Sequence, residues 1–131
     1  MGMAPLTYNS GLVLATAISG ATEVVVATVA NITTRWSGQT VTLLGWALVT
    51  TPGSTTAVTC QFRRSSLTGT QVGDHTAQAV TAAAGTSNMY QVCATDTPGD
   101  VEAFTYVLTV TCTAGSGAGS CVYGFIYADV S

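Results

Sequence analysis

Short stretches in which apolar and polar residues alternate recur along this 131-residue chain, and glycine- and proline-rich turns separate them. Apolar side chains at every second position are typical of a β-strand with one buried face. In residues 55–64, for example, Val58, Cys60 and Phe62 alternate with polar neighbours. No segment has a convincing helical period. The pattern predicts strands at 11–18, 22–30, 40–50, 55–64, 70–80, 87–95, 103–113 and 120–130.

Eight short strands at this spacing predict an all-β domain, an antiparallel β-sandwich that is most simply a jelly roll. The tripeptide Thr-Pro-Gly occurs at 51–53 and again at 97–99. Proline presets φ for the second position of a turn and glycine accepts positive φ at the third, so both tripeptides predict type II turns.

Charge is scarce in this chain. Charged residues make up 7% of the sequence, against about 25% in an ordinary soluble domain. The only basic residues are Arg35, Arg63 and Arg64, and the net charge is −3. A nucleic-acid partner would need a cationic patch that this chain lacks. No stretch has the length of a membrane span, so we also expect no membrane partner.

The strand predicted at 40–50 is apolar on both faces. Leu44, Trp46 and Leu48 point to the side opposite the core positions of the same strand. A strand that is apolar on both faces must be covered twice, and the second cover expected for a one-domain chain is another copy. These three residues are therefore candidate interface residues, although Trp46 fits a core position better than a contact.

Arg35 and Trp36, in the segment TTRWSGQ between two predicted strands, are the other interface candidates. Tryptophan and arginine are enriched at binding hot spots. A core tryptophan at the edge of a strand would have the same sequence context, so both interpretations of Trp36 stay open.

No constellation of residues predicts catalysis or a cofactor. His75, the only histidine, follows Asp74 directly, and neighbours on a strand point to opposite faces, which does not suit a catalytic relay. The segment GSGAGS at 115–120 lacks the lysine and the helix of a phosphate loop. The wide cysteine spacing does not suit zinc. We therefore expect no enzyme activity and no cofactor.

Asp96, Asp100 and Glu102 surround the second Thr-Pro-Gly turn. Three carboxylates on one turn could coordinate calcium. No calcium-loop spacing is matched, so a solvated acidic turn is the favoured interpretation.

Cys112 and Cys121 bracket eight small residues. If the flanking strands form a hairpin in which these cysteines face each other, Leu108 faces Phe125 and Val110 faces Tyr123, which are stabilising cross-strand pairs. Such a register would bring Cys112 and Cys121 within disulfide reach, and whether the bond forms stays open.

Residues 38–131 resemble small structural proteins of tailed bacteriophage virions, of the capsid decoration and head-fibre type. The similarity is carried by the segments SGQTVTLLGWALVTTPGSTTAVTCQFRRSSLTGTQVGD and ATDTPGDVEAFTYVLTV, and by the closing GSGAGSCVYGFIYADV. The final YGFIYADV more distantly resembles the last strand of trimeric jelly rolls of the tumour-necrosis-factor and complement type. These resemblances imply a jelly roll, a trimer and no enzyme activity, and they carry over no functional residue.

The sequence thus predicts a non-enzymatic virion protein that binds the major capsid shell from outside and reinforces it as a homotrimer, after assembly in the host cytoplasm. Residues 1–20, outside the resembling region, are expected to form an arm or first strand that attaches the protein, and residues 21–131 the β-sandwich. The alternative is a secreted carbohydrate-binding or adhesin-like module with Trp36 and tyrosines such as Tyr90 as a sugar platform.

Overall fold

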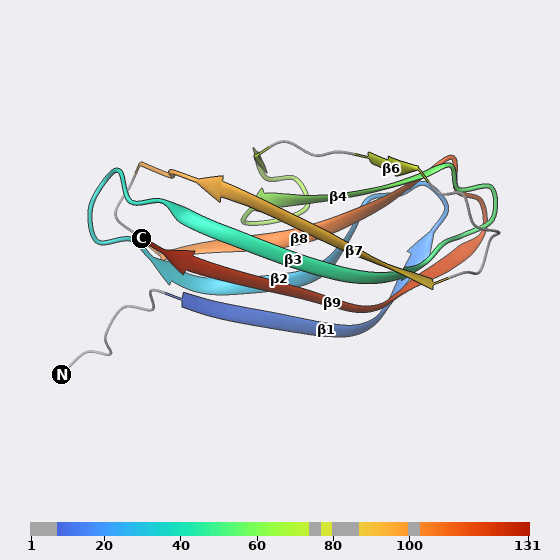
Figure 1. The fold of residues 1–131 in the computed structure, drawn as a ribbon, viewed down its shortest axis with the longest axis horizontal. Coiled ribbons are helices and arrows are strands. Elements are labelled where there is room, and N and C mark those ends of the chain that lie inside the picture. Colours follow the sequence, from blue (N-terminus) through green and yellow to red (C-terminus); the bar gives the residue numbers. More distant parts are fainter. Residues whose placement is uncertain (1–7, 74–76, 80–86, 100–102) are drawn as a thin grey trace.

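The computed structural model describes residues 8–73, 77–79, 87–99 and 103–131, and these residues form two antiparallel sheets packed face to face (Figure 1). The first sheet has the strand order β1-β9-β3-β7 and the second has the order β2-β8-β4-β5, with β6 also paired to β4. The strands are β1 (Tyr8–Ser19), β2 (Val24–Thr33), β3 (Val41–Thr50), β4 (Ala57–Arg64), β5 (Gln71–Val72), β6 (Ala77–Ala79), β7 (Ser87–Asp96), β8 (Ala103–Thr113) and β9 (Ala118–Val130).

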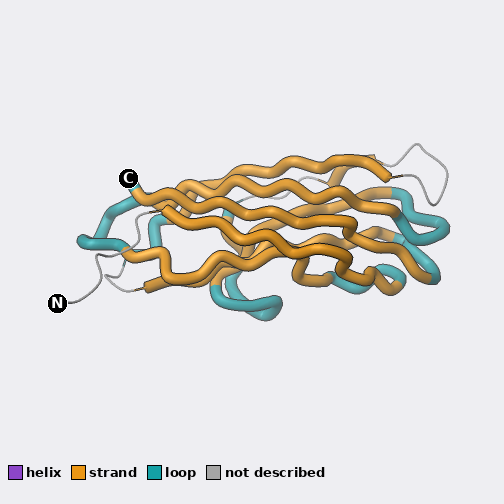
Figure 2. The backbone as a smooth tube through the Cα atoms, turned by 90° about the horizontal axis from the view of Figure 1, so that it is seen from below, coloured by secondary structure: helices purple, strands orange, loops and turns teal. Residues whose placement is uncertain are grey.

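The topology is that of a jelly roll, as predicted. Successive strands cross from one sheet to the other, except that β4, β5 and β6 stay in the same sheet. Most loops therefore lie at the two ends of the sandwich, and one projects from its side between them (Figure 2). Seven of the predicted strands are present with ends within three residues of those expected, whereas the strand expected at 70–80 is replaced by the two short strands β5 and β6. The described residues contain no helix.

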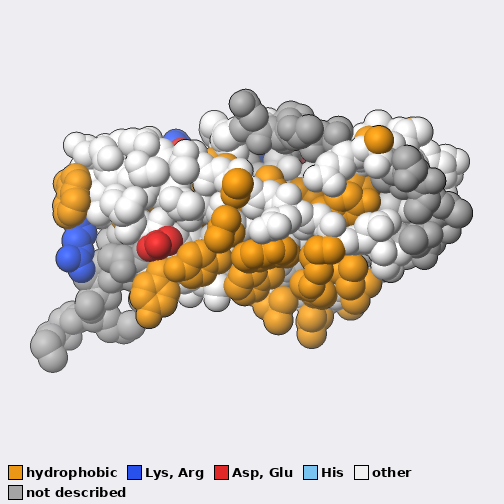
Figure 3. All heavy atoms as spheres, viewed as in Figure 1, with side chains coloured by type: hydrophobic (Ala, Val, Ile, Leu, Met, Phe, Trp, Pro, Cys, Tyr) orange, Lys and Arg blue, Asp and Glu red, His pale blue; other side chains and the backbone are white. Residues whose placement is uncertain are grey.

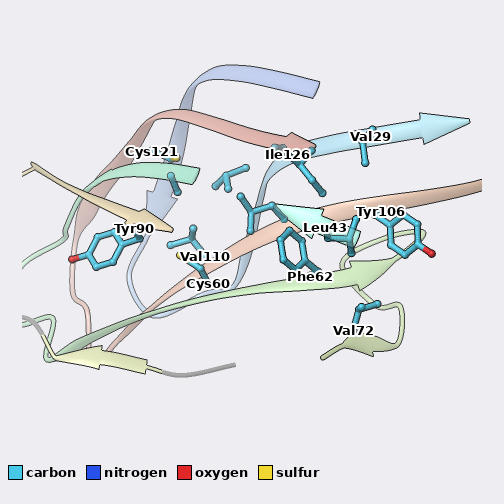
Figure 4. Close-up of a cluster of buried hydrophobic side chains, with 14 of the residues drawn as sticks. Val29, Leu43, Cys60, Phe62, Val72, Tyr90, Tyr106, Val110, Cys121 and Ile126 are labelled. Atoms are coloured by element: carbon cyan, nitrogen blue, oxygen red, sulfur yellow. The ribbon is translucent and has the colours of Figure 1, made fainter. Parts of the chain in front are cut away.

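Alternation along the strands builds the core. In β3 the residues at odd positions are fully buried, and Leu43 points towards the opposite sheet. The facing strands β4 and β8 supply Phe62, Leu108 and Val110, each with no exposed surface (Figure 4). The largest of these side chains have room because position 45 is a glycine, where a Cβ would come within 3.1 Å of both Phe62 and Leu108.

The two sheets touch backbone to backbone along one flank. A Cβ on Gly11 of β1 would lie 1.8 Å from the carbonyl oxygen of Thr28, and one on Gly124 of β9 would lie 2.1 Å from that of Val26. Glycine is therefore required at both positions, because β2 passes closer than any side chain allows.

We expect Gly124→Ala to lower the free energy of unfolding by about 3 kcal/mol, the upper end of the cost of overpacking, because the atom it meets is backbone. Urea denaturation measures the change. Gly53→Ala is the matched control, since the nearest atom to its Cβ is 3.4 Å away and little change is expected. Equal stability of the two variants would contradict the close approach of β9 to β2.

The hairpin predicted around residues 112–121 is wrong. β8 pairs with β2 and β4, whereas β9 pairs with β1 and β3 in the other sheet. Leu108 lies opposite Ala27 and Phe62, and not opposite Phe125. Alternation within two consecutive strands is the same whether they form a hairpin or cross between sheets, so the pattern alone could not separate these cases.

The glycine- and serine-rich connection between β8 and β9 is held by backbone hydrogen bonds. Ser116 N–H donates to the Gly53 carbonyl at 2.7 Å, and Gly20 N–H donates to the Gly117 carbonyl at 2.8 Å. The connection is therefore tied to two other loops at the same end of the sandwich.

The two Thr-Pro-Gly tripeptides differ in conformation. Gly99 has a φ of +85°, as the third position of a type II turn requires. Gly53 does not have a positive φ, and the left-handed residue there is Ser54, with φ +64°. The prediction of a type II turn is therefore wrong for the first tripeptide, where Gly53 instead pairs with Ser116 as an isolated β-bridge.

Residues 8–19, which were expected to belong to an arm or first strand, form β1. This strand pairs with β9 from Tyr8 to Ser19 with a break at Ala15, and its Ile18 is buried in the core. We therefore include β1 in the sandwich domain. Residues 1–7 lie outside the described residues.

Candidate functional site: the outer face of the β1-β9-β3-β7 sheet

The outer face of the β1-β9-β3-β7 sheet carries a continuous set of large apolar side chains, here called the apolar sheet face. It is built from three cross-strand rows, each running over β1, β9, β3 and β7 in that order. The rows are Leu14–Tyr123–Leu48–Met89, Leu12–Phe125–Trp46–Gln91 and Ser10–Tyr127–Leu44–Cys93. The interface residues predicted on the strand at 40–50 thus lie together at the centre of one surface.

The side chains at the margins of the apolar sheet face are the most exposed. Leu14 is 68% exposed, Leu12 59% and Met89 47%. The residues of the central strands β9 and β3 are half-buried, because they cover one another. Trp46 and Phe125 are in ring contact, with centroids 5.3 Å apart. Figure 3 shows the apolar side chains gathered on one side of the molecule.

The three rows contain no charged residue. The nearest acid along the sheet is Asp129, one row beyond Tyr127 on its own face, where it lies opposite Tyr8 and Thr42. An isolated soluble domain seldom leaves a contiguous apolar surface of this kind uncovered, and such patches mark interaction sites.

The outer face of the other sheet is closed by its own polar side chains. The Glu23 carboxylate accepts hydrogen bonds from Arg63 Nε at 2.8 Å, Gln61 Nε2 at 2.7 Å and Thr109 Oγ1 at 2.6 Å. Thr109 points away from the core but has no exposed surface, because this cluster covers it. The outer faces of the two sheets therefore differ. That of the β2-β8-β4-β5 sheet is covered by its own hydrogen-bonded and ion-paired side chains, whereas the apolar sheet face is exposed.

The hydrogen bonds from Arg63, with those from Thr109 and Gln61, hold the pKa of Glu23 at about 2, below its ordinary value of 4.5. A depressed carboxylate pKa contributes stability that is present above the unfolded-state pKa and is lost as the pH falls. We expect the free energy of unfolding to fall between about pH 4.5 and about pH 2 through Glu23. Urea denaturation over this range should show a steeper decline for the wild type than for Glu23→Gln, and parallel declines would contradict this role.

Arg35 and Trp36 lie on the loop between β2 and β3, at one end of the sandwich (Figure 1). Trp36 is 59% exposed, so the interpretation of this residue as core is wrong. Arg35 is also exposed, and its backbone N–H donates to the Gln39 side chain. The structure does not bring this loop onto the apolar sheet face, so Arg35 and Trp36 would form a separate contact.

Asp96, the described member of the candidate calcium site, is a structural residue. It lies at the end of the core, where it accepts hydrogen bonds from the Arg64 guanidinium and, at 2.8 Å, from the Tyr106 hydroxyl. Both carboxylate oxygens are used in this cluster, which joins β4, β7 and β8 across the two sheets. Asp100 and Glu102 lie outside the described residues, as does His75. The described residues hold no group of three or more potential metal ligands.

The cysteines do not form the predicted pair. Cys112 and Cys121 are fully buried on facing sheets, the register that would have paired them in a hairpin is wrong, and both are free thiols in the structure. Cys60 is buried beside them, and burial raises the pKa of its thiol to about 12 and that of Cys121 to about 11. Cys93 is exposed on the apolar sheet face.

This arrangement predicts selective alkylation. The thiolate is the reactive form, so buried thiols of raised pKa react slowly. Native monomeric protein treated with iodoacetamide at mildly alkaline pH should be modified at Cys93, and Cys60, Cys112 and Cys121 should react only after unfolding. Peptide mass spectrometry without reduction reads both alkylation and linkage. A linked peptide that joins Cys112 to Cys121 would contradict the free thiols.

Sequence reasoning missed the part of the apolar sheet face that lies on β1 and β9. A signal was present in residues 123–128, where Tyr123, Phe125 and Tyr127 alternate with Gly124 and inward-facing small or apolar residues. Tyr90, expected in a sugar platform, points inward and is 7% exposed, so it is not part of an exposed aromatic surface.

No protein-family model matches this chain, and no curated protein sequence matches it either. Solved structures do. The capsid protein VP2 of infectious bursal disease virus, solved as a subviral particle, aligns with a TM-score of 0.53 and 12% identity over 93% of this chain and 32% of VP2. This chain thus spans about a third of VP2, and the similarity shows a shared fold.

Two further structures align over nearly the whole of both chains. The Bacillus endospore appendages, described as disulfide-linked pili, match with 17% identity and a TM-score of 0.40 over 98% of this chain and 95% of that chain. A carbohydrate-binding module of family 4 (CBM4) matches with 15% identity and a TM-score of 0.43 over 95% and 92%.

None of the described segments is a helix long and apolar enough to cross a membrane.

Proposed function

We propose that this protein is a non-enzymatic structural protein of a virion, which binds the outside of a bacteriophage capsid as a homotrimer and reinforces the shell. The observation that carries the proposal is the apolar sheet face, which is uncharged and open while the opposite sheet is covered by its own side chains. The partners are further copies of the chain and the major capsid protein, with neither nucleic acid nor membrane among them.

Burial of the apolar sheet face would drive the assembly. Leu12 and Leu14 are among its most exposed residues, and burying one leucine side chain fully stabilises a complex by about 1.5–3 kcal/mol relative to leaving it in water. The half-buried aromatic residues Trp46 and Phe125 provide a rigid centre, as aromatic anchors do in interfaces. The three rows contain no charged group, so their burial carries no cost of removing a charge from water.

Two further observations support a place on a virion. The fold is shared with part of VP2, a protein that forms a subviral particle. The low charge of the chain suits a protein whose surface is largely covered in an assembly. Assembly would take place in the host cytoplasm, and the protein would end on the exterior of the capsid.

A carbohydrate-binding module is the second candidate, and the aromatic side chains of the apolar sheet face favour it. Tyr123, Phe125 and Tyr127 lie on the outward side of one strand and could stack on sugar rings. Sugar recognition also needs polar groups that fix the orientation of the ligand, and the three rows offer only Gln91 and Ser10 beside the tyrosine hydroxyls.

We expect Leu14→Lys to reduce the mass of the assembled protein in solution, because it places a charge in the apolar sheet face. Leu14 is exposed in the single chain, so the free energy of unfolding of the variant should lie within about 0.5 kcal/mol of that of the wild type. Sedimentation velocity over a concentration series measures the mass. Thr28→Lys, at an exposed position of the other sheet, is the matched control and should assemble normally.

Wild-type protein that sediments at 13.3 kDa at all concentrations would contradict free self-association. Binding on a glycan array that Phe125→Ala abolishes would favour the carbohydrate-binding candidate. A major capsid gene beside the gene of this chain would supply the shell for a cosedimentation assay, in which Leu14→Lys should bind less than Thr28→Lys.

A further inference from the structure

The outer edge of β7 is a long strand edge with no partner among the described residues. β7 pairs with β3 over ten consecutive residues, from Ser87 opposite Thr50 to Asp96 opposite Val41, without a register shift. It ends the strand order of its sheet, and no described strand pairs with its other side (Figure 1). Its outward N–H and C=O groups are thus arranged regularly for another strand.

The other described edges are irregular or covered. β1 lies against the facing sheet, where Gly11 meets the backbone of Thr28. β2 contains two register shifts, and its Asn31 has a φ of +60°. β5 and β6 have two and three residues. Short strands, bulges and covered edges are the devices by which native sheets avoid pairing with other chains, and the described residues show none of them at β7.

The sequence of β7 also lacks the residues that usually prevent an edge strand from pairing with another chain. Residues 87–95, SNMYQVCAT, contain no charged residue and no proline. An inward charge, an edge lysine or a proline is the usual guard of an exposed edge strand. Asp96 at the end of the strand is engaged by Arg64 and Tyr106 and does not guard the edge.

The sandwich is also open along part of this flank, although Gly73, next to β5, packs against Ala94 of β7. A pocket of about 210 Å³ lies between β7 and the facing strands, and it is lined by Val58, Cys60, Gln78 and the β7 residues Tyr90, Gln91, Val92 and Cys93. The opposite flank is closed backbone to backbone at Gly124 and Val26. A strand added beside β7 would bring side chains to the mouth of this pocket.

We propose that β7 pairs with β7 of a second copy, antiparallel about a two-fold axis, so that the two four-stranded sheets form one continuous sheet of eight strands. A second copy fits this edge because the outward residues of the uncharged stretch 87–95 match in kind about the central Gln91, Ser87 with Thr95 and Met89 with Cys93. An isologous contact requires such self-complementarity. The pairing also joins the apolar sheet faces of the two copies into one surface.

The register follows from two conditions. The odd-numbered residues of β7 point outward in both copies, and facing residues of a continuous sheet must lie on the same side of it. Odd residues must therefore face odd residues, so the two residue numbers of a pair sum to an even number. The longest uncharged ladder then has Gln91 opposite Gln91, with Met89 opposite Cys93 and Ser87 opposite Thr95. Centres at Val92 or Cys93 would bring Asp96 into the ladder and shorten the uncharged part.

Opposite charges at the centre of this ladder provide the test. Gln91 is exposed, so Gln91→Lys and Gln91→Glu should fold as the wild type does, which circular dichroism and urea denaturation check. Each variant alone places like charges opposite each other and should lose the edge contact, so that its limiting mass in sedimentation velocity falls to half that of the wild type. An equimolar mixture places lysine opposite glutamate and should restore the wild-type mass.

The same three measurements are made in the Leu14→Lys background, in which the apolar sheet face is disrupted. In this background the edge contact alone should give dimers. Either Gln91 variant by itself should be a monomer, and the equimolar mixture of the two should again be a dimer. Single variants with the mass of their parent, or a mixture that remains dissociated, would overturn the pairing. Failure of the proposed function would appear separately, as a Leu14→Lys protein with wild-type mass.

Discussion

The direct contact of β1 and β9 with the backbone of β2 sets the shape of this domain. Glycines at positions 11 and 124 allow carbonyl groups of the facing strand to approach where any Cβ would clash. The sandwich is therefore closed on this flank, and the large core residue Phe62 lies farther from it, on β4. The pocket beside β7 lies on the other flank, where β7 ends the strand order of its sheet.

Four of the nine charged residues of the chain form two ion pairs within the domain. Arg63 binds Glu23 over the outer face of one sheet, and Arg64 binds Asp96 at the end of the core. Only Arg35 of the three basic residues lies outside these two ion pairs, on a loop at the end of the sandwich. The apolar sheet face and the edge of β7 are therefore left without charge, although charge is what commonly keeps such surfaces apart in solution.

Much of the fold could be predicted because alternation and turn residues are local signals. The strands β3, β4 and β8 lie where the sequence placed them, and Leu44, Trp46 and Leu48 share the outward side of β3 as their spacing requires. The pairing of β8 with β9 was predicted wrongly, because the partner of a strand depends on contacts with distant segments. The same limit hid the rows of the apolar sheet face, in which Leu14, Tyr123, Leu48 and Met89 come from four separate parts of the chain.

By itself the sequence determined that the protein is an all-β domain, that β3 is apolar on both sides and that charge is too scarce for a cationic surface, because period, composition and turn chemistry act over a few residues. Tertiary structure alone decided which strands are neighbours and which of them is left as an edge. It buried Cys112 and Cys121 on facing sheets, engaged Asp96 in the core and exposed Trp36. Each of these outcomes depends on packing between residues far apart in the chain, which no local pattern records.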